Sequence, residues 1–317
     1  MDPTQTRTSI VIMILGLMII SACGIVTPAR LLSTPLNPTP TTVPVTVTFT
    51  PLPQETPTAI PTTTLVPLNL NPQIILLAEN LPEPDDLVLA PNGSVYVSDV
   101  TEGTIKEYIP NGQLNLILSG LNEPEGMAFT PDGSLIIAEQ GANRLIRYDP
   151  QSKTLAPFLG LVNHTPNLGV DGILWDGTNL IIPDSPNGTV LEVSSDGKTV
   201  RQLASGLARP TGAWMESTGD LLIADENGNA VYRLHRDGTL EKVADFSIPD
   251  DVIEDASGNI FVVTLGDDAV HVLIAGTNQD VILVSGLNNP QGIIFDAGGN
   301  LIVTDSGNHR LLKVLIH

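Results

Sequence analysis

The chain has 317 residues and carries 35 acidic against 14 basic side chains, a formal net charge of −21. A surface this acidic repels phosphate backbones, so nucleic acid is excluded as an expected partner. The single cysteine, Cys23, rules out an intramolecular disulfide, and a composition with 42% hydrophobic but only 4% aromatic residues predicts an aliphatic core.

The first 22 residues have the pattern of a bacterial export signal. Arg7 precedes an apolar run from Ile10 to Ile20, which is too short to span a bilayer. The sequence that follows, ISACG ending at Gly24, resembles the lipobox of bacterial lipoproteins. This resemblance implies cleavage before Cys23, lipid attachment to its sulfur and anchoring to the extracytoplasmic side of the cell membrane. The alternative is an ordinary cleaved signal followed by an incidental cysteine.

A segment rich in threonine and proline follows, and we assign residues 23–68 to the lipidated cysteine and a linker. Between Thr27 and Leu68 there are 10 prolines and 13 threonines, more than half of the stretch. Proline disfavours helices and central strands, and the composition offers no core. We therefore expect a disordered stalk that holds the folded domain away from the membrane.

The remaining residues, 69–317, contain six imperfect repeats. Their starting points are separated by 40, 40, 46, 39 and 41 residues, and they lie at Leu81, Leu121, Leu161, Leu207, Phe246 and Leu287. Each repeat contains short apolar runs of strand character separated by turns rich in Gly, Asn, Asp and Pro, and none shows a helical period of adequate length. This period predicts an all-β, six-bladed β-propeller with four antiparallel strands in each blade.

The last repeat predicts how the ring closes. We expect strands at Gly292–Phe295, Leu301–Thr304 and Leu311–Leu315, which leaves this blade one strand short. The run Gln73–Ala78, upstream of the first repeat, resembles the fourth-strand run of blade five. We therefore predict that this N-terminal strand completes blade six and removes an open sheet edge.

Residues 290–310 carry the clearest motif of the chain. The run from Pro290 through Gly292 and Asp305 to Arg310 looks like an NHL repeat, and the whole of 69–317 resembles the NHL and SMP-30/gluconolactonase group of six-bladed propellers. The resemblance is specific for the fold. It says little about activity, because this scaffold carries many functions.

Acidic residues recur at the end of the second strand of most repeats. We interpret them as structural, because a carboxylate at a strand end can cap turn N–H groups, and Arg144 and Arg310 are placed to pair with a neighbouring acid. These strand-end acids are Asp99, Glu139, Asp184, Asp225 and Asp305, and Thr264 interrupts the series.

A second recurring position is the residue just before the glycine of the first strand, or its equivalent, and we call it the channel position. In the resembling propellers it faces the central channel. Its six occupants are Asp85, Glu125, Asp171, Thr211, Asp250 and Gln291. Four converging carboxylates repel each other unless a cation lies among them, and oxygen ligands suit Ca²⁺ or Mg²⁺. The sequence thus suggests Asp85, Glu125, Asp171 and Asp250 as metal ligands; the alternative is four hydrated carboxylates without a metal.

The resemblance implies more about two of these residues. SMP-30-type lactonases bind a divalent cation through Glu, Asn and Asp at such positions; Asp85 matches the family's Glu, and Asp250 matches its Asp. The family's asparagine ligand is replaced by Val170, and Pro210-Thr211-Gly212 offers no second asparagine. Asp250 and His164, the latter in the longer third repeat, are the candidate catalytic groups.

Two functions remain open at this point. The first is an extracytoplasmic, monomeric binding or scaffolding propeller for a protein, glycan or small ligand. The second is a divalent-cation-dependent hydrolase of lactones or esters. A lyase resembling the streptogramin-inactivating propellers is a more distant alternative, since no paired catalytic histidines are evident.

Overall fold

The computed structural model describes residues 67–110, 112–162, 168–277 and 279–317. The predicted signal peptide, Cys23 and most of the stalk therefore lie outside the described residues. Among the described residues, no helix is long and apolar enough to cross a membrane.

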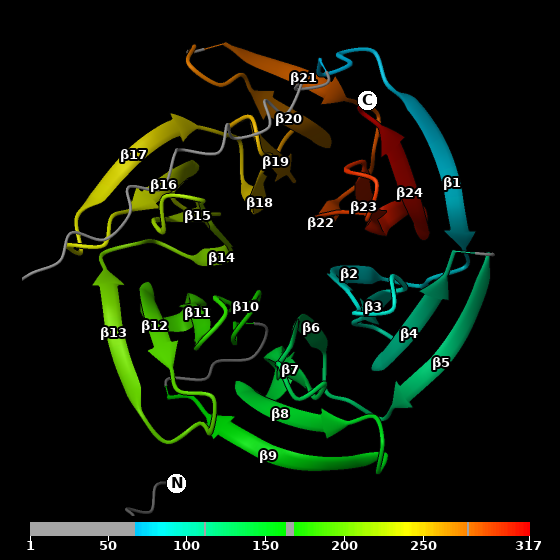
Figure 1. Ribbon diagram of the computed structural model, residues 1–317, viewed down its shortest axis with the longest axis vertical. Helices are drawn as coiled ribbons and strands as arrows, with labels where there is room; N and C mark the ends of the chain where they lie inside the picture. Colours follow the sequence, from blue (N-terminus) through cyan, green and yellow to red (C-terminus); the bar gives the residue numbers. More distant parts are fainter. Residues whose placement is uncertain (1–66, 111, 163–167, 278) are drawn as a thin grey trace, which may run out of the picture. The chain divides into compact units, whose positions relative to one another are not determined.

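Six four-stranded antiparallel sheets form a closed ring, which confirms the predicted propeller (Figure 1). The first three blades contain β2 (Pro84–Leu89), β3 (Val95–Asp99), β4 (Thr104–Ile109) and β5 (Gln113–Ser119); β6 (Pro124–Phe129), β7 (Leu135–Glu139), β8 (Arg144–Asp149) and β9 (Thr154–Gly160); and β10 (Leu174–Trp175), β11 (Leu180–Asp184), β12 (Thr189–Val193) and β13 (Val200–Ser205). The first strand of each blade lies at the centre of the ring and the fourth at its rim.

The other three blades repeat this order. They contain β14 (Pro210–Met215), β15 (Leu221–Asp225), β16 (Ala230–Leu234) and β17 (Leu240–Asp245); β18 (Pro249–Glu254), β19 (Ile260–Thr264), β20 (Ala269–Leu273) and β21 (Asp280–Val284); and β22 (Pro290–Phe295), β23 (Leu301–Asp305), β24 (Arg310–Leu315) and β1 (Gln73–Glu79). Three single 3-10 turns, η1 (Gln140–Ala142), η2 (Ser185–Asn187) and η3 (Ser306–Asn308), follow the second strands of blades two, three and six.

The ring closes where β1 pairs with β24, as the sequence predicted. Gln73 lies opposite Leu315 and Ile75 opposite Lys313 in an antiparallel register. Figure 1 shows this join as the cyan β1 beside the red β24. Strands from opposite ends of the domain thus share one sheet, which gives blade six its fourth strand and joins the two ends of the ring.

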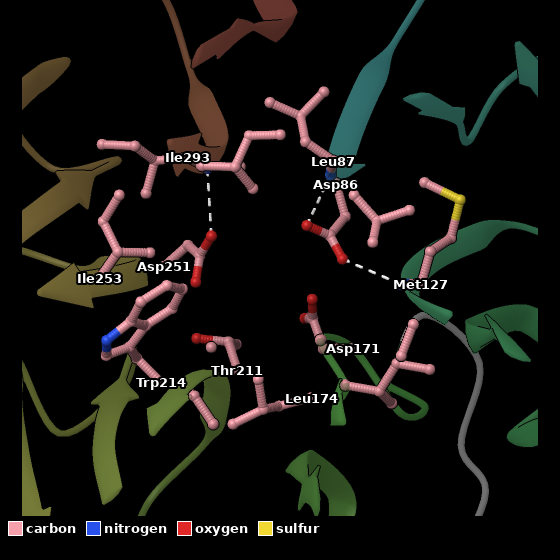
Figure 2. A pocket seen from close by; sticks show the side chains of 18 of the residues that line it. Asp86, Leu87, Met127, Asp171, Leu174, Thr211, Trp214, Asp251, Ile253 and Ile293 are labelled. Carbon is pink, nitrogen blue, oxygen red and sulfur yellow. Dashed lines mark hydrogen bonds between the residues drawn. The ribbon is translucent and has the colours of Figure 1, made fainter. Parts of the chain in front are cut away.

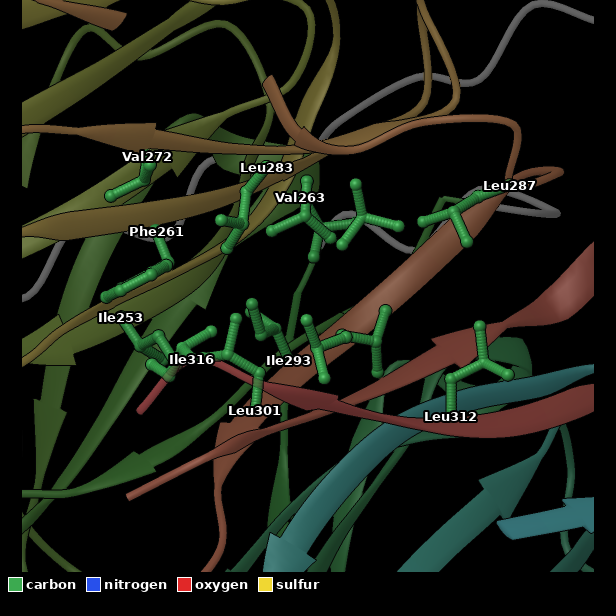
Figure 3. Packing of buried hydrophobic residues seen from close by; sticks show 14 residues of the cluster. Ile253, Phe261, Val263, Val272, Leu283, Leu287, Ile293, Leu301, Leu312 and Ile316 are labelled. Carbon is green, nitrogen blue, oxygen red and sulfur yellow. The ribbon is translucent and has the colours of Figure 1, made fainter. Parts of the chain in front are cut away.

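The core is divided among the interfaces between neighbouring blades. The described residues form six clusters of buried aliphatic side chains, one at each interface. Successive residues of a strand point to opposite faces, so Leu135 and Ile137 pack toward blade one while Ile136 packs toward blade three. Figure 3 shows the cluster between blades five and six, where Phe261 and Ile293 are both 0% exposed. The expected aliphatic core is therefore observed.

The central strands approach one another closely at the residue after each channel position, which we call the junction position. Four blades have glycine there, at Gly126, Gly172, Gly212 and Gly292. A Cβ atom on Gly126 would lie 2.5 Å from the carbonyl oxygen of Asp171 in the next blade. Such a contact is too short for any side chain, so glycine at this position sets how near two blades can pack.

This packing predicts a specific loss of stability in the Gly126→Ala variant. The added methyl group must push blades two and three apart, and overpacking of this kind costs about 1–3 kcal/mol. Gly160→Ala is the matched control, because a Cβ atom there meets nothing within 4 Å. Chemical denaturation of both variants checks the expectation, and equal stability of the two would contradict the close approach.

Candidate functional site in the central channel

A repeated backbone irregularity aims the channel residues at the axis. In five blades the central strand begins with proline, and the pairing register shifts over the two residues that follow it. In blade one, Pro84 lies opposite Asp99 and Leu87 opposite Val97, so Asp85 and Asp86 form a bulge. A bulge re-aims side chains and is common beside functional sites.

The four channel carboxylates are buried. Asp85 is 7% exposed, Glu125 6%, Asp171 8% and Asp250 8%. One oxygen from each of Asp85, Glu125 and Asp171 lies within 4.8 Å of the other two, and we call these three residues the acidic triad. Asp250, from blade five, lines the same cavity as Asp85 and Asp171.

Two members of the triad have hydrogen-bonding partners that the sequence did not indicate, and one of these partners is charged. The guanidinium group of Arg209 donates from Nη2 to Oδ2 of Asp171 over 2.9 Å and also pairs with Glu226. Gln140, in η1, donates from Nε2 to Oε2 of Glu125 over 2.5 Å. Gln140 follows the strand β7, and Arg209 precedes the strand β14. An alignment of the repeats on their strands therefore does not reveal these two partners.

Asp85 and Asp250 differ from the other channel acids. Neither side chain accepts a hydrogen bond from any described residue. Only their backbone carbonyl groups are paired, with the hydroxyl groups of Thr304 over 2.6 Å and Thr211 over 2.7 Å. A buried carboxylate without a donor is costly, and either a proton or a cation can relieve that cost.

The electrostatic environment favours protons or a cation in the channel. Burial, together with the charge of Asp171, raises the pKa of Asp85, Glu125 and Asp250 well above the ordinary carboxyl value. Burial also raises the pKa of Asp171, although Arg209 and a hydrogen bond from Glu125 act in the opposite direction. Each of these carboxyl groups therefore holds its proton to a higher pH than an ordinary carboxyl group does.

Two further carboxylates occupy junction positions where the other blades have glycine. Asp86 accepts from the backbone N–H of Leu87 over 2.6 Å and of Met127 over 3.1 Å. Asp251 accepts from the backbone N–H of Val252 over 2.8 Å and from that of Ile293, in the next blade, over 3.1 Å. Each aspartate thus bridges its blade to the following one, in place of the close glycine contact.

These bridging aspartates also have raised pKa values. For Asp86, burial and the charge of Asp251 raise the pKa well above its ordinary value. For Asp251, burial raises the pKa to about 7, although its two backbone N–H donors act in the opposite direction.

The channel contains a cavity of about 390 Å³. Its acidic part is lined by Asp85, Asp86, Asp171, Asp250 and Asp251, and the rest is lined mainly by apolar residues such as Met127, Leu174, Trp175, Trp214, Ile253 and Ile293. Figure 2 shows Asp86, Asp171, Thr211 and Asp251 pointing into this space. No basic side chain lines the cavity among the described residues. It therefore suits a small ligand that is positively charged at one end or accompanied by a cation.

The triad fits a hard divalent cation by its donor chemistry. Three carboxylates from three blades converge within 4.8 Å, and Asp85 has a free carboxylate there. Ca²⁺ and Mg²⁺ prefer such oxygen donors.

Comparison with known proteins agrees with the fold. Residues 287–314 match the NHL repeat. None of the curated proteins compared with the chain matches it significantly. The repeat lies in blade six and contains Asp305 and Arg310, as the sequence resemblance predicted.

Several solved structures share the propeller. A structure named for a gluconolactonase has a TM-score of 0.65 and 21% identity, with 77% of this chain and 91% of that chain covered. The gluconolactonase of Xanthomonas campestris has a TM-score of 0.64 and 15% identity, with 78% and 90% covered. Virginiamycin B lyase of Staphylococcus aureus has a TM-score of 0.61 and 14% identity, with 78% and 99% covered. At these identities the likeness establishes the fold alone.

The remaining residues singled out by the sequence have simpler roles or lie elsewhere. The strand-end acids are structural, since Glu139 pairs with Arg144 over 2.6 Å and Asp305 with Arg310 over 2.7 Å. His164 lies outside the described residues. The sequence did not indicate four residues of the site, namely Asp86, Asp251, Arg209 and Gln140. For the two aspartates one signal was available, because the other four blades have glycine at the same position.

The raised pKa values predict an unusual pH dependence for the metal-free protein. The folded state holds these carboxyl protons more tightly than the unfolded chain does, so stability falls as pH rises through the raised values, which for Asp251 is about 7. From the ordinary carboxyl pKa of about 4 up to about pH 7, the titration of Asp251 lowers the free energy of unfolding by up to about 1.4 kcal/mol per pH unit.

Urea denaturation in EDTA across this range measures the effect. Glu125→Gln should reduce the fall, because it removes one titrating group and one charge. Stability that is constant or rises over the same range would contradict the picture of a proton-retaining channel.

Proposed function

We propose that the propeller is a binding protein for a small ligand, which it holds in the central cavity beside a divalent cation. The supporting observation is a cavity in which two buried carboxylates, those of Asp85 and Asp250, accept no hydrogen bond from the described residues. The triad would hold the cation, and the apolar wall would contact the ligand. Bound Ca²⁺ would supply positive charge to carboxylates that otherwise repel one another.

The place of action is part of this proposal. The lipobox-like sequence around Cys23 supports export and lipid anchoring, with the propeller acting on the extracytoplasmic side as a monomer. Labelling of the cell-grown protein with radioactive palmitate, compared with Cys23→Ser, tests the anchor. Protein and glycan ligands are the less favoured alternatives, because a cavity of about 390 Å³ among the central strands suits a small molecule.

Calcium binding to the full-length chain is the first test. Ca²⁺ added after EDTA should raise the midpoint of thermal unfolding by about 5–10 °C at a concentration one hundred times its dissociation constant, because only the folded state binds it. Asp171→Asn and Glu125→Gln should lose most of this increase. Asp132→Asn, which removes a charge from an exposed hairpin turn, should retain it. An unchanged midpoint in the unmodified chain would refute the cation site.

Hydrolysis of lactones or esters is the second candidate, and one observation favours it. Asp250 has no hydrogen-bond donor, lines the cavity and has a raised pKa caused by burial and by the charges of Asp171 and Asp85. Such a carboxylate could take a proton from water as it adds to a substrate carbonyl. When bound, a cation would polarise that carbonyl.

A panel of lactones and aryl esters distinguishes the two candidates. A hydrolase should show Ca²⁺-dependent turnover that falls by about 10²-fold or more in Asp250→Asn, with ligand binding retained. Saturable binding of panel members without turnover would support the binding protein and exclude this hydrolase.

A further inference from the structure

The cavity has two chemically different sides. On one side, Arg209 and Gln140 contact the acidic triad. On the other side, which is formed by blades four, five and six, Asp250 and Asp251 face the cavity without any basic or amide partner among the described side chains. The second side therefore holds two carboxyl groups that no described side chain pairs with, and only the more distant charge of Arg209 favours the ionised form of Asp250.

Asp251 is held in a fixed position on this side. A Cβ atom on Gly212 would lie 2.5 Å from Oδ1 of Asp251, so the carboxylate rests against β14. Its Oδ1 accepts from the N–H of Val252 over 2.8 Å, and its Oδ2 accepts from the N–H of Ile293 over 3.1 Å. A carboxylate oxygen can accept two hydrogen bonds, so each oxygen can accept one more.

An apolar wall stands beside this carboxylate. Trp214 follows Gly212 by two residues on β14 and so lies on the same face of the strand. Its ring packs edge-on against Phe295, with ring centroids 6.2 Å apart and planes at 72°. Figure 2 shows Trp214, Ile253 and Ile293 around Asp251. A fixed indole ring next to carboxylates can contact both the charge and the carbon skeleton of an organic cation.

Asp250 supplies an independent indication of a ligand. It is only 8% exposed, it lines the cavity, and its carboxylate accepts no hydrogen bond from the described residues. The carboxylate of Asp251 follows it on the same strand, and the wall beside them is apolar. An ammonium group needs only three acceptors.

We propose that this side of the cavity binds the protonated amino group of a small apolar amine. The ammonium group would donate to Asp250 and Asp251, and the carbon skeleton would pack on Trp214, Ile253 and Ile293. The inference rests on the proposed small-ligand function and names its ligand class. A cavity of about 390 Å³ is near the small end for ligand sites, so it suits a one-ring amine.

A matched pair of probes tests the proposal on the full-length chain. 2-Phenylethylamine and 2-phenylethanol have the same skeleton and differ in the charged group. Calorimetry in excess EDTA and mildly alkaline buffer, with tryptophan fluorescence as a second readout, compares their affinities. We expect the amine to bind at least about tenfold more tightly than the alcohol. Equal affinities would overturn the proposal.

Two equivalent variants locate the site. Asp251→Asn should weaken amine binding by about tenfold or more, whereas Asp86→Asn should weaken it by less than about threefold. Both variants replace a junction-position aspartate that bridges two blades, so the comparison controls for the lost bridge. Equal losses would overturn the assignment, and if either variant fails to fold, the two probes on the unmodified chain decide.

Tryptophan variants give a separate check of the wall. Trp214→Phe should abolish the fluorescence change caused by the amine, and Trp175→Phe should retain it; the reverse result would overturn the location.

Because these titrations are made without metal, they are independent of the calcium test. Calcium binding without amine binding would refute only this inference, whereas failure of both would also refute the proposed function.

Discussion

The close approach of the central strands at the propeller axis is the constraint on which the site depends. Glycine at the junction position lets one backbone lie against the carbonyl group of the next blade, as Gly126 does against Asp171. The residue immediately before that glycine must then share the axis with its five counterparts. Carboxylates at adjoining channel positions are thereby brought within a few ångströms of one another and largely removed from water.

This arrangement costs stability unless positive charge or protons enter the channel. Arg209 pairs with Asp171, whereas Asp85 and Asp250 form no ion pair with any described side chain and feel only the more distant charge of Arg209. The aliphatic clusters between the blades and the β1–β24 pairing hold the ring closed against this repulsion. The same rigidity that imposes the repulsion keeps the carboxylates in place for a ligand, so stability and function are coupled at the axis.

The sequence predicts the fold well because the fold is repetitive. Six copies of one pattern, together with the spare strand at Gln73–Glu79, determine the number of blades and the closure. The channel position could also be identified, since it keeps its place relative to the strand. Asp86 and Asp251 were missed because an aspartate in place of glycine looks like ordinary variation between repeats. Arg209 was missed because a long side chain reaches Asp171 in another blade, which strand periodicity cannot show.

Anomalous diffraction from crystals of the protein grown with Mn²⁺ tests most directly whether the acidic triad binds a divalent cation. Such data locate a bound cation without reference to activity or stability. We expect one strong peak with carboxylate oxygens of Asp85, Glu125 and Asp171 as ligands, at the short distances typical of metal–oxygen bonds. No peak at the axis at saturating Mn²⁺, with the triad unchanged and Arg209 still paired to Asp171, would contradict it.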